Sequence, residues 1–177
     1  MVFIVYTNLY NTNLLLWAMN NPPLSVAIAA LIQNNKILMI KRNRGSYAGL
    51  LGLPGGKVEK NEHLSEAVTR EVLEEAGIES TFKKHLGFVS EHLVEDSEVL
   101  QHFLLHVCEL EPHSTEVTES SEGELEWFDL DRMEEMKEQI IPSDLHILNN
   151  LVKKREKEYY NCVIEKSGED YELKKFE

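Results

Sequence analysis

The chain has 177 residues, of which 42% are hydrophobic and 28% are charged. This length and composition suit one folded domain with a real core, and they exclude a disordered chain. The net charge of -13 at pH 7 leaves no basic surface for a nucleic acid polymer. Because so acidic a protein repels free polyphosphate, a phosphorylated partner would need bound cations. The sequence also lacks the roughly 18 uninterrupted apolar residues of a membrane span, so no membrane partner is expected.

Residues 1–23 are interpreted as an N-terminal extension. Nothing before Lys36 is charged, and the apolar run at the start is interrupted by threonine and asparagine. A signal peptide is not expected, because there is no basic n-region and no small-residue cleavage site. Two interpretations stay open: a strand or hairpin packed on the domain, or upstream sequence before a true start at Met19. Cys108 and Cys162 lack metal-ligand spacing and predict free thiols in a cytoplasmic protein.

The first half of the domain predicts two strands, a loop and a helix. Apolar runs at 26–32 and 37–40, separated by an Asn-Asn pair, are typical of a strand, a turn and a strand. A loop rich in glycine and proline follows at 45–56. Residues 62–76 predict a helix that ends at Gly77, where glycine commonly terminates helices.

The second half predicts longer strands, an acidic loop and a second helix. Residues 82–89 and 99–108 have the character of strands, and 109–126 is acid-rich with scattered serine and threonine, which favours a solvated loop. A Trp-Phe strand comes next. Residues 144–157 predict a helix, because one face carries the aliphatic residues Leu145, Leu148, Leu151 and Val152.

The predicted fold class is α/β. Strands interleaved with two principal helices indicate a sandwich in which helices cover a mixed sheet. The main domain is expected over residues 24–157. Residues 158–177 predict a C-terminal hairpin, turning at Ser167 and Gly168, that packs on the same domain.

One face of the 62–76 helix changes from apolar to acidic along its length. Its members have the three- and four-residue spacings that form one stripe on a helix; they are Leu64, Ala67, Val68, Glu71, Glu74 and Glu75. The three glutamates lie within about 5–6 Å of one another at Cβ, a spacing at which like charges destabilise a helix unless something neutralises them. A solvated acidic face is the simplest alternative. The acids continue the buried stripe, however, and this favours a functional cluster.

Hard oxygen ligands grouped in this way suit Mg²⁺ or Mn²⁺ and leave coordination positions for water and phosphate oxygens. A glycine-rich turn, Pro54-Gly55-Gly56, lies just upstream of the helix. Glycine lets the backbone approach a metal where a side chain would obstruct it. The sequence therefore predicts a site for Mg²⁺, with Mn²⁺ as an alternative ion, beside this turn.

Residues 56–78, GKVEKNEHLSEAVTREVLEEAGI, resemble the Nudix box, Gly-x5-Glu-x7-Arg-Glu-U-x-Glu-Glu-x-Gly-U, in which U is an apolar aliphatic residue. The match has no departure; its positions are Gly56, Glu62, Arg70, Glu71, Val72, Glu74, Glu75, Gly77 and Ile78. The resemblance implies a Nudix α/β/α sandwich in which the box forms a loop, a helix and a loop. It also implies hydrolysis of a nucleoside diphosphate linked to a further group.

The resemblance also assigns roles to the residues of the box. Glu71, Glu74 and Glu75 would be metal ligands, joined by the carbonyl of Gly55. Arg70 and Glu62 would pair and orient these carboxylates. The box does not specify which glutamate acts as general base.

Three further roles at the site have candidate residues outside the box. Glu122, with Glu124 as second choice, precedes the Trp-Phe strand, where many Nudix enzymes place another acid; the alternative is a solvated loop residue. Arg42 resembles the basic residue that contacts a substrate phosphate in MutT-like members, and a surface arginine is the alternative. Asp144 comes shortly after Pro142, and it resembles the polar residue of MutT-like enzymes that follows a similarly placed proline and binds the purine edge. Its alternative is an N-cap or first-turn acid of the last helix.

The expected partner is a small-molecule nucleotide, bound by a monomer or a homodimer. The proline typical of many ADP-ribose hydrolases is missing about sixteen residues after the box, where the chain reads Leu93-Val94-Glu95. The tyrosine of dinucleoside polyphosphate hydrolases is also missing, near Asp96. A MutT-like hydrolase of (deoxy)nucleoside triphosphates is therefore predicted. A hydrolase of ADP-ribose or a nucleotide sugar, and a non-catalytic nucleotide-sensing module, remain the alternatives.

Overall fold

The computed structural model of the chain describes residues 22–118, 121 and 123–177. Both interpretations of the N-terminal extension concern residues that lie almost entirely outside this range. Glu122 also lies outside the described residues, so its predicted role has no structural counterpart. Each helix in the described ranges is too short or too polar to span a membrane.

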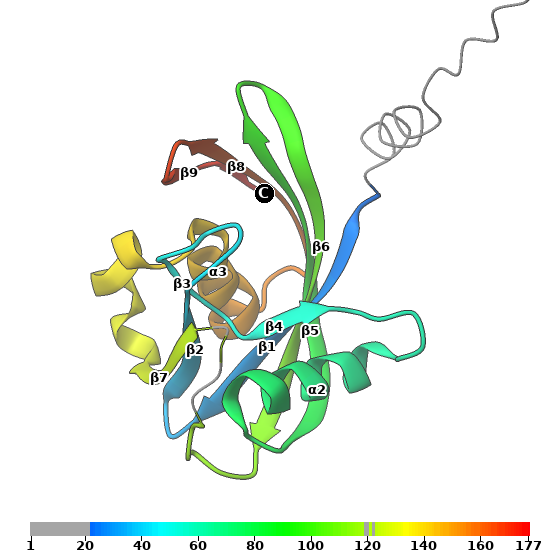
Figure 1. Ribbon diagram of the computed structural model, residues 1–177. Helices are drawn as coiled ribbons and strands as arrows, with labels where there is room; N and C mark the ends of the chain where they lie inside the picture. Colours follow the sequence, from blue (N-terminus) through cyan, green and yellow to red (C-terminus); the bar gives the residue numbers. More distant parts are fainter. Residues whose placement is uncertain (1–21, 119–120, 122) are drawn as a thin grey trace, which may run out of the picture.

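A mixed β-sheet forms the centre of the described structure (Figure 1). Its main path runs in the order β3-β2-β1-β6-β5-β8-β9, while β4 pairs with β1 and β7 pairs with β2. Pairing is parallel between β1 and β6 and between β5 and β8, and the other pairs are antiparallel. The strands are β1 (Leu24–Gln33), β2 (Lys36–Arg42), β3 (Leu51–Gly52), β4 (Gly55–Lys57), β5 (Ser80–Glu95), β6 (Glu98–Pro112), β7 (Gly123–Asp129), β8 (Tyr159–Ser167) and β9 (Asp170–Phe176).

Helices cover the sheet from both sides, which confirms the predicted α/β class (Figure 1). Helix α2 (Leu64–Ala76) packs its buried side chains against one apolar cluster that includes Ala27 and Leu38. Helix α3 (Pro142–Ile147) and the π-helical turn η2 (Leu148–Lys154) pack on a second cluster. The alternating side chains of β1 and β2 supply both clusters, because successive residues of a strand face opposite sides of the sheet.

Local signals fix both ends of α2. His63 occupies the N-cap, and the carboxylate of Glu66 accepts from its backbone N–H at 2.6 Å, as in a capping box. Gly77 ends the helix in the left-handed conformation (φ 68°) and donates its N–H to the carbonyl of Leu73. The helix therefore starts two residues later than the sequence predicts and ends where it predicts.

The prediction of a solvated loop over residues 109–126 is wrong at both of its ends. Strand β6 continues to Pro112, and β7 begins at Gly123. The acids at the end of β6 are tolerated because lysines of β5 neutralise them across the strands: Lys83 pairs with Glu111 at 2.6 Å and Lys84 with Glu109 at 3.6 Å. Cross-strand ion pairs of this kind stabilise a strand whose own composition favours a loop.

The last third of the chain differs from the prediction in its helices. A 3₁₀ segment, η1 (Leu130–Gln139), was not expected; its N-cap is Asp129, whose carboxylate accepts from the N–H of Asp131. The second helix starts at Pro142, changes to π geometry and ends at Lys154. Beyond it, β8 and β9 form an antiparallel hairpin whose turn contains Gly168, and β8 adds to the sheet beside β5.

Candidate functional site

A cavity of about 680 Å³ opens beside the glycine turn that precedes α2. Its walls come from β1, the end of β2 and the loop after it, the turn at β4, α2, β5, β6 and the start of α3. We call the part lined by Arg70 and the glutamates of α2 the charged, or α2, end of the cavity. The part lined by the buried residues of β5 and α3 is the buried, or α3, end. The polar and charged lining residues are Arg42, Arg44, Ser46, Tyr47, Lys57, Glu59, Arg70, Glu71, Glu74, Glu75, Glu91, Ser143 and Asp144.

The turn between β3 and β4 brings two box glutamates onto the backbone. Gly55 has a φ of 147°, and a Cβ there would lie 2.1 Å from the carbonyl oxygen of Ala27, so only glycine fits. The N–H of Gly55 donates to Oε2 of Glu75 at 2.9 Å. A Cβ on Gly56 would lie 2.4 Å from the carboxylate of Glu71. Both carboxylates therefore press against the same turn.

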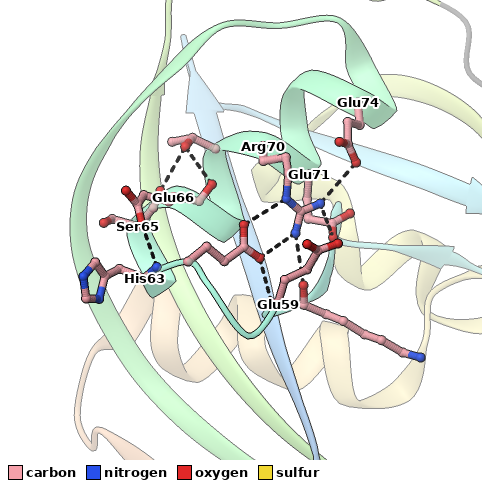
Figure 2. A network of polar contacts seen from close by, with 10 residues as sticks. Glu59, His63, Ser65, Glu66, Arg70, Glu71 and Glu74 are labelled. Carbon is pink, nitrogen blue, oxygen red and sulfur yellow. Dashed lines mark hydrogen bonds and ion pairs between the residues drawn. The ribbon is translucent and has the colours of Figure 1, made fainter.

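Arg70 is the organising cation of the charged end (Figure 2). Its Nε and Nη2 donate to the two carboxylate oxygens of Glu62 at 2.9 and 2.7 Å, which is the pairing that the resemblance implied. Its Nη1 lies 2.8 Å from Glu71 and 3.1 Å from Glu74. The hydrogen bond from Arg70 lowers the pKa of Glu62 to about 2. These glutamates thus share one guanidinium, which offsets their mutual repulsion.

The donor set fits a divalent cation. In the described part of the chain, no three His, Cys, Asp or Glu side chains already converge on one point. The carboxylates of Glu71 and Glu74 instead share the positive charge of Arg70, and that of Glu75 accepts from the Gly55 amide. Carboxylate oxygens held beside a turn with no Cβ suit a hard ion such as Mg²⁺ or Mn²⁺.

The buried end of the cavity contains Asp144. Its side chain accepts the N–H of Leu53 at 2.7 Å, and the residue is 5% exposed. Burial raises the pKa of Asp144 to about 7, while the Leu53 N–H and the nearby Arg42 act in the opposite direction. The N-cap interpretation is wrong, because Ile141 occupies that position. Asp144 does stand in the first turn of α3, but its carboxylate faces β3 rather than the helix end.

A second buried acid, Glu91 on β5, was missed by sequence reasoning. It is 1% exposed; the hydroxyl of Tyr47 donates to its Oε1 at 2.7 Å, and Ser143 and Cys162 also hydrogen-bond to it. Burial raises the pKa of Glu91. The available signal was alternation: Glu91 takes the inward position between Val89 and Leu93, but the predicted strand stopped at 89.

Arg42 also faces the cavity, as the sequence suggested. Its Nε donates to the carbonyl of Ser46 at 3.1 Å, and its charge acts on Asp144. The sequence did not single out Arg44 and Lys57, which add two further basic groups to the lining. Glu124, the second choice for an extra acid, is exposed on β7, where it lines different surface depressions.

The NUDIX domain family model matches residues 22–151, and the chain belongs to this family. An ADP-ribose pyrophosphatase of Methanocaldococcus jannaschii is 36% identical over 111 residues, which are 62% of this chain and 64% of that protein. An oxidized purine nucleoside triphosphate hydrolase of Danio rerio is 27% identical over 108 residues, 61% of this chain and 67% of that protein. The chain thus aligns with about two thirds of each of these relatives.

Solved MutT structures share the fold. A MutT protein of Methanosarcina mazei Go1 has a TM-score of 0.65 at 27% identity, covering 77% of this chain and 98% of that one. The MutT protein of Bacillus halodurans has a TM-score of 0.69 at 24% identity, covering 87% and 96%. These similarities confirm a Nudix fold of the MutT-like type.

Proposed function

We propose that this protein is a divalent-cation-dependent pyrophosphohydrolase that cleaves a nucleoside triphosphate to a nucleoside monophosphate and pyrophosphate. One observation carries the proposal. The carboxylates of Glu71 and Glu75 press against the Gly55–Gly56 turn at the charged end of a cavity, and the other end has buried groups able to hydrogen-bond a base. The cavity therefore offers separate places for a polyphosphate and a nucleoside.

Glu71, Glu74 and Glu75, with the carbonyl of Gly55, would hold the cation. Bound Mg²⁺ or Mn²⁺ polarises a phosphoryl oxygen and lowers the pKa of an attacking water. Arg70 and Glu62 keep the carboxylates in place through the ion pairs described above. A protein with a net charge of -13 needs such cations, since it would otherwise repel a polyphosphate.

Arg42 and Asp144 would bind the two ends of the substrate. The guanidinium of Arg42 offers a fixed donor array that suits phosphate oxygens. The carboxyl of Asp144 accepts from an exocyclic amine when ionised, or donates a hydrogen bond when protonated, and a pKa of about 7 allows both states near neutral pH. This pairing favours a nucleoside triphosphate as substrate.

ADP-ribose is the second candidate substrate. It is favoured by the relative from Methanocaldococcus jannaschii, which is named an ADP-ribose pyrophosphatase and is 36% identical over the aligned part. Against it stands the missing proline at residues 93–95. The chemistry at the charged end would be the same for both substrates, because each contains a diphosphate linkage.

The test is a panel of nucleoside triphosphates, ADP-ribose and dinucleoside polyphosphates, incubated with Mg²⁺, with Mn²⁺ and with EDTA. We expect pyrophosphate and a nucleoside monophosphate from a triphosphate, no turnover in EDTA, and recovery when the cation is restored. Faster release of AMP and ribose phosphate from ADP-ribose would make ADP-ribose the substrate in place of a triphosphate. The protein would still be a pyrophosphohydrolase. Full turnover in chelator would contradict the mechanism, and binding without turnover would indicate a nucleotide-sensing module.

A further inference from the structure

The loop after β2 is held from two sides through one residue, Tyr47. The backbone of Tyr47 has a φ of 63°, a left-handed conformation that is strained for a tyrosine. Its N–H donates to the hydroxyl of Tyr171 on β9 at 3.1 Å, and the two rings lie 4.5 Å apart. Its own hydroxyl donates to Glu91 at 2.7 Å. Tyr47 is thereby fixed at its backbone and at the tip of its side chain.

Because Tyr47 is held in place, the loop residue before it can orient the guanidinium of Arg42. Ser46, the residue before Tyr47, supplies the carbonyl that accepts from Nε of Arg42 at 3.1 Å. The backbone closes the same loop, since Gly49 donates to the carbonyl of Arg42 and Leu50 to that of Tyr47. This hydrogen bond fixes one edge of the guanidinium of Arg42, a residue that lines the cavity.

We propose that Tyr171 of the C-terminal hairpin is a positioning residue for the substrate pocket: through Tyr47 it sets the loop that directs Arg42 toward a substrate phosphate. The hairpin lies after residues 22–151, the span matched by the NUDIX family model, yet through Tyr171 it contacts Tyr47, a lining residue of the cavity. This inference rests on the proposed function, in which Arg42 contacts a phosphate. In Figure 1 the red β8–β9 hairpin curls over the same side of the sheet as the cyan loop between β2 and β3.

Tyr171→Phe removes the hydroxyl that accepts from Tyr47 and keeps the ring contact. The matched control is Tyr159→Phe on β8, which removes a hydroxyl bonded to Asn161 on the same hairpin. Hydrogen exchange at the Tyr47 amide is measured first, without substrate. We expect faster exchange in Tyr171→Phe only, with both variants unfolding near the temperature of the parent protein.

The second measurement is the affinity for magnesium pyrophosphate by calorimetry, in a cycle of Tyr171→Phe, Arg42→Ala and the double variant. When Arg42 is present, loss of the hydrogen bond between Tyr47 and Tyr171 should weaken pyrophosphate binding about fivefold. The loss should be under about twofold when Arg42 is absent, because coupled residues are not additive. KM for the best substrate of the panel should follow the same pattern, with kcat little changed.

Two results would overturn the positioning role. One is unchanged pyrophosphate affinity in Tyr171→Phe despite faster exchange at Tyr47. The other is an equal loss with and without Arg42, which would indicate a general structural effect of the hairpin. A panel that yields no hydrolysis, with the pyrophosphate cycle behaving as expected, would refute the proposed function and leave the positioning role standing.

Discussion

Two sets of carboxyl groups, one at and beside the α2 end of the cavity and one at its α3 end, differ in their charged partners. At the α2 end, Glu62 and Glu71 share the guanidinium of Arg70, and this partner holds the pKa of Glu62 at about 2. At the α3 end, Glu91 and Asp144 are 1% and 5% exposed, and burial raises both of their pKa values. The pKa of a carboxyl group is thus lowered beside the α2 end of the cavity, at Glu62, and raised at the α3 end, at Glu91 and Asp144.

The difference suggests a division of labour. Carboxylates that stay ionised beside a cation suit the binding of a metal and, through it, of phosphate. A carboxyl whose pKa lies near neutrality can donate or accept a hydrogen bond, which suits contact with a neutral base edge. Substitutions at the α2 end should therefore act on kcat, and substitutions at the α3 end on KM and selectivity.

The largest expected effect is at the α2 end. Glu75→Gln keeps the shape of a side chain that accepts the Gly55 N–H but removes its charge. We expect kcat to fall on the order of 10³-fold, the scale on which one preorganised electrostatic group contributes to catalysis. The unfolding temperature in metal-free buffer should be unchanged or higher, because crowded like charges are relieved.

Steady-state kinetics with Mg²⁺ measure this effect, and Glu79→Gln is the matched control. Glu79 lies just beyond α2, and its side chain is 80% exposed. The control should retain normal kcat. Near-normal turnover in both Glu74→Gln and Glu75→Gln would show that the box is not the catalytic centre.

A smaller effect is expected from adding one methyl group at each end. In Gly56→Ala, the new Cβ would meet the carboxylate of Glu71 at 2.4 Å, so the carboxylate must move and kcat should fall about 10- to 100-fold. In Gly52→Ala, the Cβ would instead meet Ile141 at 2.8 Å and Asp144 at 3.1 Å, which should raise KM. If both variants lose kcat and neither changes KM, the proposed division of labour between the two ends is wrong.

Much of the α2 end could be predicted from sequence because its signals are local. Spacing along one helix placed three glutamates on a stripe, and the glycine turn lies only a few residues upstream. The contacts of Arg70 with Glu62, Glu71 and Glu74 stay within one segment of the chain. Helical periodicity is sufficient to anticipate the stripe of glutamates, whereas the pairing of Arg70 with Glu62, which precedes α2, was expected from the resemblance to the Nudix box.

The α3 end could not be assembled in the same way. Tyr47 and Glu91 are 44 positions apart, and Leu53 and Asp144 are 91 apart. Such contacts depend on which strands pair and in what register, and a single sequence does not specify either. The acidic end of β6 was predicted as a loop for the same reason, because the lysines of β5 that pair with its acids lie far away in the sequence.

The next effect concerns selectivity at the α3 end. Asp144→Asn keeps an oxygen that can accept the Leu53 N–H but fixes the side chain as neutral. We expect the ratio of kcat/KM between guanine and adenine triphosphates to change about tenfold, as for one hydrogen bond made or lost to a base. Affinity for Mg²⁺ should be unchanged. Asp170→Asn, at the exposed hairpin turn, is the control, and an unchanged ratio in Asp144→Asn would remove Asp144 from base recognition.

The smallest effect is the dependence of stability on pH, which has opposite signs at the two ends. The folded-state pKa of Asp144, about 7, lies above its ordinary value of 3.8, so the unfolded chain releases a proton that the folded protein keeps. The free energy of unfolding should therefore fall as pH rises from 4 to 7, by up to about 1 kcal/mol per pH unit from this group. Asp144→Asn should flatten the decline, and Glu91, shifted in the same direction, should leave a residual slope.

Glu62 has a lowered pKa of about 2, so its contribution is present above pH 4.5 and is lost as pH falls toward 2. Urea unfolding from pH 2 to 8 measures both: Glu62→Gln should change only the acid limb, and Asp144→Asn only the limb between pH 4 and 7. Identical curves for Asp144→Asn and the parent protein would mean that Asp144 is ionised at ordinary pH, and the contrast between the two ends would then be wrong.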